Sequence, residues 1–357
     1  MTIFIPLIIA FLITTILTPI SLGLIRKMGL LDNPKTHKHP GIIHKKTTPR
    51  GGGIPFFVGI AITGLFFLPL TKTIVMLFIA GLIALLIGVL DDKYDISPYV
   101  RFAGNIVAAL IVVLGAGISV PFITNPFGGI LFLNLIILPL NFLGIHFSIV
   151  LSDVIAVLWI VWVMNMLNWS KGVDGQMPGI VAISAITIGI LSLRFAGIDS
   201  FSKISGDLSF IIAGASLGFL IFNFHPAKIF PGYGATAIYL LLSAASMLSG
   251  AKLATAILVM GIPMIDGLFT IFRRLLSGKS PFWHDKKHLH HLLLSFGFSQ
   301  RYIALFYWII SAILGAIALV LSSRAKLFAI IMLLIVVSGT LSFMHRILNK
   351  TYDKDRL

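Results

Sequence analysis

Three aspartates, Asp91, Asp92 and Asp95, lie within five residues of one another, directly after the apolar run 74–90. Carboxylates beside a hydrocarbon layer are costly, and they are typical of sites that bind a cation, a proton or a charged ligand. We therefore expect these acids to belong to a site that handles phosphate through a metal ion or a basic partner. One of them could instead cap the next helix, but Ser97 is the better capping residue there.

A basic loop precedes an earlier apolar run. It contains Lys46 and ends in the three glycines at 51–53. Glycines let backbone N–H groups approach an anion closely, and the helix N-terminus that follows favours negative charge. The same loop could be only a solvated basic segment next to anionic lipid. The sequence leaves both interpretations open.

Asn165 and Asn168 lie one helical turn apart at the end of another apolar run, so their amides share a face. Amides can bind a hard cation or hydrogen-bond a diphosphate or a sugar, although buried amides also bond to neighbouring helices. The turn that follows holds Lys171 and Asp174 beside glycines. This combination favours a polar site.

A last cluster extends from Arg273 and Arg274 to His288, His290 and His291. The chain has no cysteine and only one acid near these histidines, so a tetrahedral zinc site is poorly supported. Paired arginines and clustered histidines suit a diphosphate, which they can bind by charge-assisted hydrogen bonds. The arginines could equally be ordinary basic residues at a membrane boundary.

Composition predicts which elements position these clusters. The chain is 58% hydrophobic and only 11% charged, against roughly 25% charged residues in soluble domains. A membrane helix needs about 20 apolar residues. Eleven stretches are candidates, at 2–25, 53–70, 73–90, 101–120, 148–167, 179–193, 207–222, 235–250, 252–268, 301–322 and 327–345. We expect an all-α integral membrane protein in which residues 1–357 form a single polytopic domain.

Basic residues predict the orientation of these spans. The chain has 27 Lys and Arg, and on one side of the membrane there are only Lys72, Arg194, Lys203, Lys252, Arg324 and Lys326. The positive-inside rule makes the other side cytoplasmic, with the N-terminus outside and the C-terminus inside. Every polar cluster described above then faces the cytoplasm. The net charge of +15 follows from this distribution and does not indicate a nucleic-acid partner.

The stretch 121–147 is the only sizeable outer segment under this topology. It contains Pro121, Pro126, Gly128 and Gly129, followed by an alternating apolar run at 131–139. We expect a short hairpin or an interfacial re-entrant piece here.

Taken in order, the motifs resemble those of the polyprenyl-phosphate N-acetylhexosamine-1-phosphate transferases (glycosyltransferase family 4), and most closely the undecaprenyl-phosphate GlcNAc-1-phosphate transferase branch. The resemblance rests on Asp91-Asp92-x-x-Asp95, Asn165-x-x-Asn168-x-x-x-Gly-x-Asp174-Gly, the Phe-Asn-x-x-Pro-Ala-Lys-Ile-Phe run at 222–230, and His288-x-His290-His291. It implies transfer of a sugar-1-phosphate from a UDP-sugar to a polyprenyl phosphate, with release of UMP, at the start of cell-envelope glycan synthesis. It also implies a multi-pass protein of the bacterial inner membrane, in contact with lipid and able to form a homodimer.

The resemblance assigns roles to these residues. Catalysis is expected of Asp91, Asp92 and Asp174, together with Lys171, which stands at a family aspartate. Substrate binding is expected of Lys46, Asp95, Asn165, Arg273, Arg274, His288, His290 and His291. The family's Mg²⁺ is expected at Asn168 and Asp92.

The chain departs from the family pattern at two positions where an acid is expected. Lys171 and Tyr233 replace aspartates, and one of those aspartates is a metal ligand in the family. The pocket is therefore more positive, and Mg²⁺ is not expected to bind through the same ligands. Asn105 replaces a glutamine that the family often has, which is a smaller change.

Three hypotheses remain open from the sequence. The protein could be a divergent transferase in which Lys171 supplies part of the charge that Mg²⁺ supplies elsewhere. It could be a non-catalytic family member that binds lipid phosphate or nucleotide sugar. It could also be a carrier that has kept these loops for structure.

Overall fold

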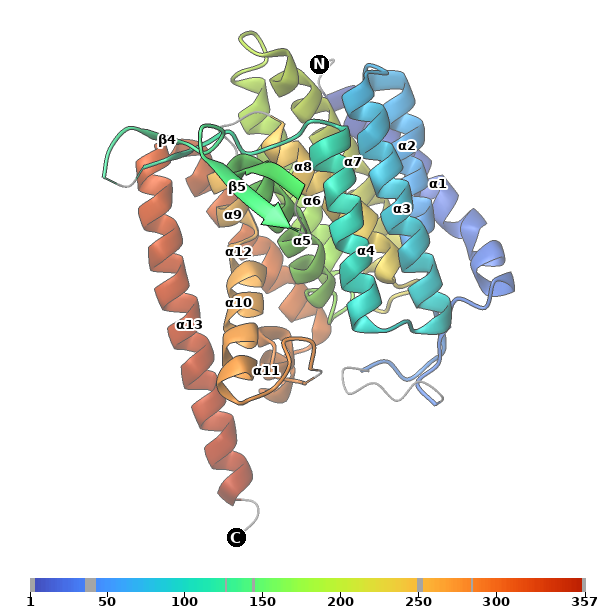
Figure 1. Ribbon diagram of the computed structural model, residues 1–357. Helices are drawn as coiled ribbons and strands as arrows, with labels where there is room; N and C mark the ends of the chain where they lie inside the picture. Colours follow the sequence, from blue (N-terminus) through green and yellow to red (C-terminus); the bar gives the residue numbers. More distant parts are fainter. Residues whose placement is uncertain are drawn as a thin grey trace.

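The computed structural model describes residues 4–35, 43–125, 127–142, 145–248, 253–283 and 285–354, and it is mostly helical (Figure 1). The helices are α1 (Ile5–Lys27), α2 (Gly53–Phe67), α3 (Lys72–Tyr94), α4 (Pro98–Leu110), α5 (Leu151–Trp169), α6 (Gln176–Leu193), α7 (Ser200–Asn223), α8 (Thr236–Met247), α9 (Leu253–Val259), α10 (Gly261–Leu276), α11 (Leu289–Ser295), α12 (Gln300–Val320) and α13 (Ser323–Lys354).

Within these described ranges, 8 helices are long and apolar enough to cross a membrane, or 9 if α9 and α10 count as one span. Two further apolar helices, Gly53–Phe67 and Tyr233–Met247, are shorter. Each expected span coincides with one of these elements, although the ends of the spans 2–25, 235–250 and 252–268 fall partly outside the described residues. A mostly helical membrane protein is confirmed.

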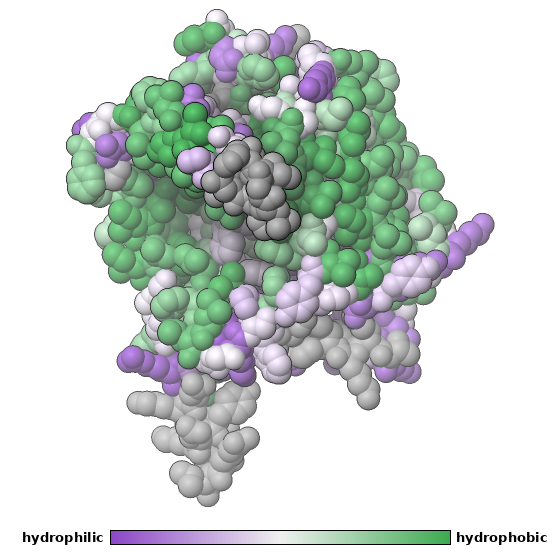
Figure 2. Space-filling view, viewed as in Figure 1, coloured by the Kyte–Doolittle hydropathy of each residue, from purple (hydrophilic) through white to green (hydrophobic). Residues whose placement is uncertain are grey.

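The surface agrees with this assignment. Figure 2 shows apolar side chains over the middle of the visible face, with polar side chains gathered towards its two ends. Large apolar residues such as Phe66, Leu114 and Ile335 are exposed. A monomeric soluble protein rarely exposes so much continuous apolar surface, whereas lipid covers it without cost. Helices α6 and α7 are the most buried of the long apolar helices, and α13 is the most peripheral.

The expected span at 252–268 is interrupted. Helices α9 and α10 meet at an angle of 80°, just before Gly261. Pro263 lies in the first turn of α10, where it has no N–H to bond to the carbonyl of Val259 and therefore cannot continue α9. We expected one continuous helix, so the bend was missed although its proline is visible in the sequence. Beyond the bend, α10 carries the two arginines of the last cluster.

Short strands complete the fold. The expected hairpin in 121–147 is confirmed, since β3 (Phe122–Thr124) pairs with β4 (Ile130–Phe132) and β5 (Ile137–Phe142) pairs with β6 (Ile145–Val150), both antiparallel. In Figure 1 these hairpins lie at the upper end of the helical body, opposite α11. A third ladder joins β1 (Leu31–Asp32) to β2 (Thr48–Pro49) and places Arg50 directly after β2.

Candidate active site

A cavity of about 450 Å³ opens where several helices end and their connecting loops meet. Most of the expected site residues line it, namely Asp91, Asp95, Asn165, Asn168, Lys171, Asp174, Arg274, His288, His290 and His291. They come from α3, α5, α10, α11 and the loops after them, which are far apart in the sequence. The polar clusters therefore belong to one site, as expected.

Three expected residues do not line this cavity. Lys46 is exposed outside it, Arg273 bonds to the lining residue Asp285 without lining it, and Asp92 is buried behind it. The cavity also has lining residues that we did not assign a role, including Arg50, Trp283 and Arg101. Arg50 stands directly before the three glycines, so the basic loop reaches the cavity through Arg50 and not through Lys46.

Asp91 and Asp92 are adjacent in the sequence but differ in their surroundings. The Asp92 carboxylate accepts hydrogen bonds from Arg50 Nε at 3.0 Å and from the backbone N–H groups of Tyr233 at 2.8 Å and Gly234 at 3.4 Å. Its side chain is buried and does not line the cavity. Asp92 therefore holds the backbone around Tyr233 in place.

The approach of α3 to this backbone depends on a glycine. Gly88 lies one turn before Asp92, and a Cβ atom there would overlap the backbone of Tyr233 and Gly234. Residues four apart share a helix face, so the close contact at Gly88 brings Asp92 onto the same backbone. Any larger residue at 88 would separate these elements.

The Asp91 carboxylate faces the cavity. Its Oδ2 lies 3.2 Å from Arg101 Nη1 and 3.6 Å from Arg50 Nη2. Its Oδ1 is buried and has no hydrogen-bond partner among the residues described. A buried acceptor without a partner costs free energy unless a ligand or a water molecule donates a hydrogen bond to it. Of the two neighbouring acids, Asp91 is therefore the one that lines the cavity and has an oxygen without a partner.

Lys171 projects into the cavity from the loop after α5. Its Nζ donates a hydrogen bond of 3.0 Å to the carbonyl oxygen of Gly232, a residue whose φ of 68° is in the left-handed region that favours glycine. Burial lowers the pKa of Lys171 to about 8, although the charges of Asp92 and Asp91 oppose this shift. The ammonium form prevails at neutral pH.

Tyr233 lies between two cations. Its ring centroid is 5.2 Å from Arg101 Cζ and 5.7 Å from Lys171 Nζ, distances at which an aromatic ring attracts a cation. Its hydroxyl accepts a hydrogen bond of 3.1 Å from Asn105 Nδ2. The two positions that replace family acids, 171 and 233, are therefore in contact, and the asparagine at 105 bonds to the tyrosine.

Asp174 is fixed by its neighbours. Its Oδ2 lies 2.8 Å from His225 Nδ1 and accepts a hydrogen bond of 3.1 Å from the backbone N–H of Ala227. Asn223 links the same loops, because it accepts from the N–H of Gly175 and donates to a carbonyl in the loop after α7. Asp174 thus lines the cavity while tying two loops together.

The three histidines form a row in which each ring contacts the next. His288 Nδ1 lies 2.9 Å from the carboxylate of Asp266, and the ring of His290 stacks on that of His288 with centroids 5.7 Å apart. Gly172 allows this row to approach the Lys171 loop, since a Cβ atom at 172 would overlap the His290 ring. His290 Nδ1 is buried with no partner in the described part of the chain.

Burial and the neighbouring histidines lower the pKa of His290 well below 6.5, and burial lowers the pKa of His291 to about 4. Both rings are therefore neutral at pH 7. They can bind a ligand by ordinary hydrogen bonds but do not supply the positive charge that their clustering suggested.

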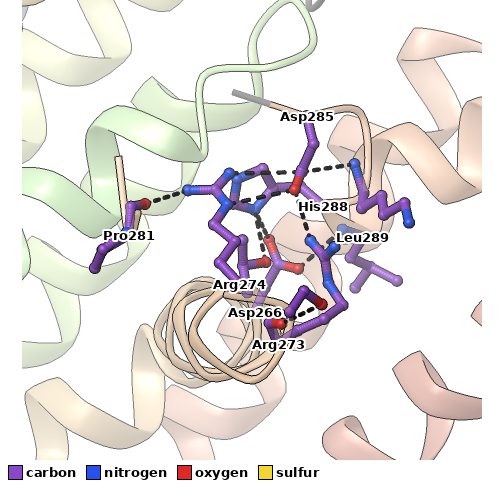
Figure 3. A network of polar contacts seen from close by, with 10 residues as sticks. Asp266, Arg273, Arg274, Pro281, Asp285, His288 and Leu289 are labelled. Carbon is purple, nitrogen blue, oxygen red and sulfur yellow. Dashed lines mark hydrogen bonds and ion pairs between the residues drawn. The ribbon is translucent and has the colours of Figure 1, made fainter. Parts of the chain in front are cut away.

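Arg273 and Arg274 are held by a carboxylate. Asp285 accepts hydrogen bonds from Arg273 Nη2 at 3.0 Å and from Arg274 Nε at 3.3 Å, and Arg274 Nη1 donates to the carbonyl of Pro281 at 2.5 Å (Figure 3). Burial alone would raise the pKa of Asp285, but the two guanidinium groups hold it at about 2. These contacts fasten the loop that places Trp283 at the cavity wall.

The expected Mg²⁺ ligands do not fit that ion in this arrangement. Both oxygens of Asp92 accept protein hydrogen bonds behind the cavity wall, and the Lys171 ammonium stands on the cavity side. Asn168 Oδ1 is buried without a partner, but one amide oxygen does not make a site for an ion that prefers several oxygen ligands. No group of three metal-binding side chains occurs within the described ranges.

Comparison with known proteins agrees with the resemblance carried by the motifs. The family model "Glycosyl transferase family 4" matches residues 74–251. The probable undecaprenyl-phosphate N-acetylglucosaminyl 1-phosphate transferase of Bacillus subtilis is 33% identical over 92% of this chain and 88% of its own. The decaprenyl-phosphate N-acetylglucosaminephosphotransferase of Mycobacterium tuberculosis is 32% identical over 96% and 90%.

A more distant relative extends the same pattern. The undecaprenyl-phosphate alpha-N-acetylglucosaminyl 1-phosphate transferase of Escherichia coli K12 is 30% identical over 87% of this chain and 82% of its own. These matches span nearly the whole length of both partners and include the loops that form the cavity. The chain therefore belongs to glycosyl transferase family 4.

Proposed function

We propose that this protein transfers N-acetylglucosamine-1-phosphate from UDP-N-acetylglucosamine to a polyprenyl phosphate such as undecaprenyl phosphate. The observation that carries the proposal is the cavity at the helix ends, where Asp91 lies among Arg50, Arg101 and Lys171. The names of the relatives described above are those of enzymes that catalyse this class of reaction. None of these names favours the non-catalytic alternative.

The reaction joins two anions. An oxygen of the lipid phosphate attacks the phosphorus that carries the sugar, and the bond from that phosphorus to the bridging oxygen breaks. UMP leaves with the bridging oxygen, and the sugar remains on the lipid through a diphosphate. Such a reaction depends chiefly on in-line positioning and on positive charge around the transferred phosphoryl group.

The side chains at the cavity suit these needs. Arg50, Arg101 and Lys171 supply positive charge, and the free Oδ1 of Asp91 can accept the proton of a monoprotonated lipid phosphate. Asp92 positions the backbone that accepts the Lys171 hydrogen bond. The neutral His290 offers a hydrogen-bonding nitrogen for the sugar or the nucleotide.

The membrane arrangement belongs to the same proposal. All eleven expected spans would cross a bacterial inner membrane as one domain, with the N-terminus outside and the cavity on the cytoplasmic side. The start of α1 and the end of α13 lie at opposite ends of the helical body, which supports an odd number of crossings (Figure 1). A homodimer is the expected assembly.

The proposal is tested with purified protein in detergent. UDP-N-acetylglucosamine and undecaprenyl phosphate should yield UMP and a lipid-linked sugar diphosphate in equal amounts, and omission of the lipid should abolish UMP release. Binding of both substrates without UMP would contradict the proposal and would revive the non-catalytic alternative.

A further inference from the structure

Three cations meet at the base of the cavity. Arg50 follows β2, Arg101 lies on α4, and Lys171 follows α5, so three separate parts of the fold contribute. Two carboxylates, Asp91 and Asp92, face them. Among these five side chains the cations outnumber the carboxylates by one, while Asp32, Asp95 and Asp174 also line the cavity.

The surplus resides on Lys171. Arg50 pairs with both carboxylates and Arg101 pairs with Asp91. In the part of the chain that the structure describes, the one hydrogen bond of the Lys171 ammonium goes to the neutral carbonyl of Gly232. An ammonium has three donors, so two remain for a ligand.

Tyr233 keeps this surplus from being neutralised. Its ring attracts Arg101 and Lys171 without accepting a proton from either, and its hydroxyl is occupied by Asn105. An acid at this position would pair with both cations and leave none for a ligand. The tyrosine therefore separates Arg101 from Lys171 and leaves the Lys171 ammonium available to the cavity.

We propose that Lys171, Arg50 and Arg101 form a metal-independent binding site for a phosphate group, in which the Lys171 ammonium takes the place of a divalent cation. Buried cations around a phosphate give strong, charge-assisted hydrogen bonds. The Lys171 ammonium also repels a divalent cation at its own position, so this side chain disfavours Mg²⁺ there.

Two phosphates could occupy the site, the diphosphate of a nucleotide sugar and the monophosphate of a polyprenyl lipid. Both present anionic oxygens of the same chemistry, so the charges alone do not separate them. We assign the site to the diphosphate of the nucleotide sugar, and this assignment rests on the transferase activity proposed above. The binding of a phosphate group does not depend on that activity.

The test is titration calorimetry on the purified protein in detergent, with EDTA or with Mg²⁺. The probes are UDP-N-acetylglucosamine, inorganic pyrophosphate and farnesyl phosphate. The variants are Lys171→Met, Lys171→Arg and Lys27→Met, the last being an exposed lysine at the end of α1 that does not line the cavity. Thermal unfolding establishes that each variant is folded.

The wild type should bind at least one probe equally well with EDTA and with Mg²⁺. Loss of a charge-assisted hydrogen bond should weaken this binding about tenfold to hundredfold in Lys171→Met. Lys171→Arg should retain most of the affinity and Lys27→Met all of it. The probe whose affinity falls in Lys171→Met identifies the source of the phosphate. Either source supports the site.

Binding that disappears in EDTA would overturn the inference, as would Lys171→Met binding like the wild type. Lys171→Asp provides a second arm, since it adds an acid beside Asp91. Its binding should require Mg²⁺, and unchanged binding by this variant in EDTA would count against the site. The wild-type arm remains decisive if this variant does not fold.

The two proposals can fail separately. Probe binding that requires Mg²⁺, together with UMP release in Mg²⁺, would overturn the metal-independent site and leave the transferase intact. Tight binding in EDTA with no UMP release under any condition would leave the site intact and overturn the transferase.

Discussion

Two regions at the cavity contain clustered basic residues, and they differ in what neutralises them. At the base, Arg50, Arg101 and Lys171 face two carboxylates, and Lys171 retains an unpaired charge. At the rim, Arg273 and Arg274 share the carboxylate of Asp285, and three nitrogens of Arg274 donate to Asp285 or to the carbonyl of Pro281 (Figure 3). We call these the basal cluster and the rim clamp.

The difference shows that basic residues near a site do not by themselves identify a ligand contact. Arg274, whose three side-chain nitrogens all donate within the protein, holds a loop, whereas a cation with open donors can bind an anion. The sequence predicted the rim arginines as phosphate ligands, but their geometry suits them to positioning. Phosphate binding falls instead to the basal cluster.

The largest expected effect is at the base. Asp91→Asn should lower UMP release by about 10²–10⁴-fold, the usual contribution of a positioned acid or base. Asp153→Asn, at the start of α5 and outside the cavity, is the control. Measured rates that are equal in both variants would remove Asp91 from the chemistry.

A matched pair compares the two regions directly. The side chains of Arg101 and Arg273 are 17% and 22% exposed, so replacing either with methionine removes a charge of similar burial. Arg101→Met should weaken UDP-N-acetylglucosamine binding about tenfold or more, and Arg273→Met should weaken it only a few-fold. Calorimetry gives both values, and equal losses would erase the distinction between basal cluster and rim clamp.

The pH dependence sharpens the role of Lys171. Its pKa is about 8, lowered by burial and by Arg50 and Arg101 and raised by Asp92 and Asp91. The ammonium is present below this pH and is lost above it, so affinity for the anionic donor should fall up to about tenfold per pH unit above pH 8. The Lys171→Arg variant keeps its charge and should bind equally at pH 7 and pH 9. Parallel curves for the two proteins would assign the fall to another group.

The smallest effect is expected in the rim clamp. Asp285→Asn leaves two guanidinium groups without their carboxylate and should destabilise the protein by about 1–3 kcal/mol. The midpoint of thermal unfolding should fall, and KM for the nucleotide sugar should rise a few-fold with kcat nearly unchanged. A large fall in kcat with normal stability would instead make the clamp part of the catalytic machinery.

Much of the fold could be predicted from the sequence, because lipid imposes apolar stretches of a defined length. The helices and the gathering of the polar loops at their ends follow from that constraint, whereas the hairpins in 121–147 were indicated by prolines, glycines and an alternating apolar run. The bend between α9 and α10 was missed since a proline early in a helix reads equally well as the start of a new helix or as a tolerated residue.

Local sequence could not distinguish Asp91 from Asp92. Successive residues on a helix point about 100° apart, so only one of two neighbours faces a given cavity. Which one does so depends on the contact of Gly88 with the backbone at Tyr233, more than 140 residues away. The pairing of Arg50 with Asp92 across 42 residues is invisible for the same reason.

The measurement that tests the central claim most directly is UMP release by the wild-type protein in detergent, from UDP-N-acetylglucosamine and undecaprenyl phosphate, with EDTA or with Mg²⁺. UMP in both conditions at similar rates is the predicted result, because the basal cluster supplies the charge from its own side chains. UMP only with Mg²⁺ would contradict it, and would mean that Asn168 and the remaining acids hold a metal despite Lys171.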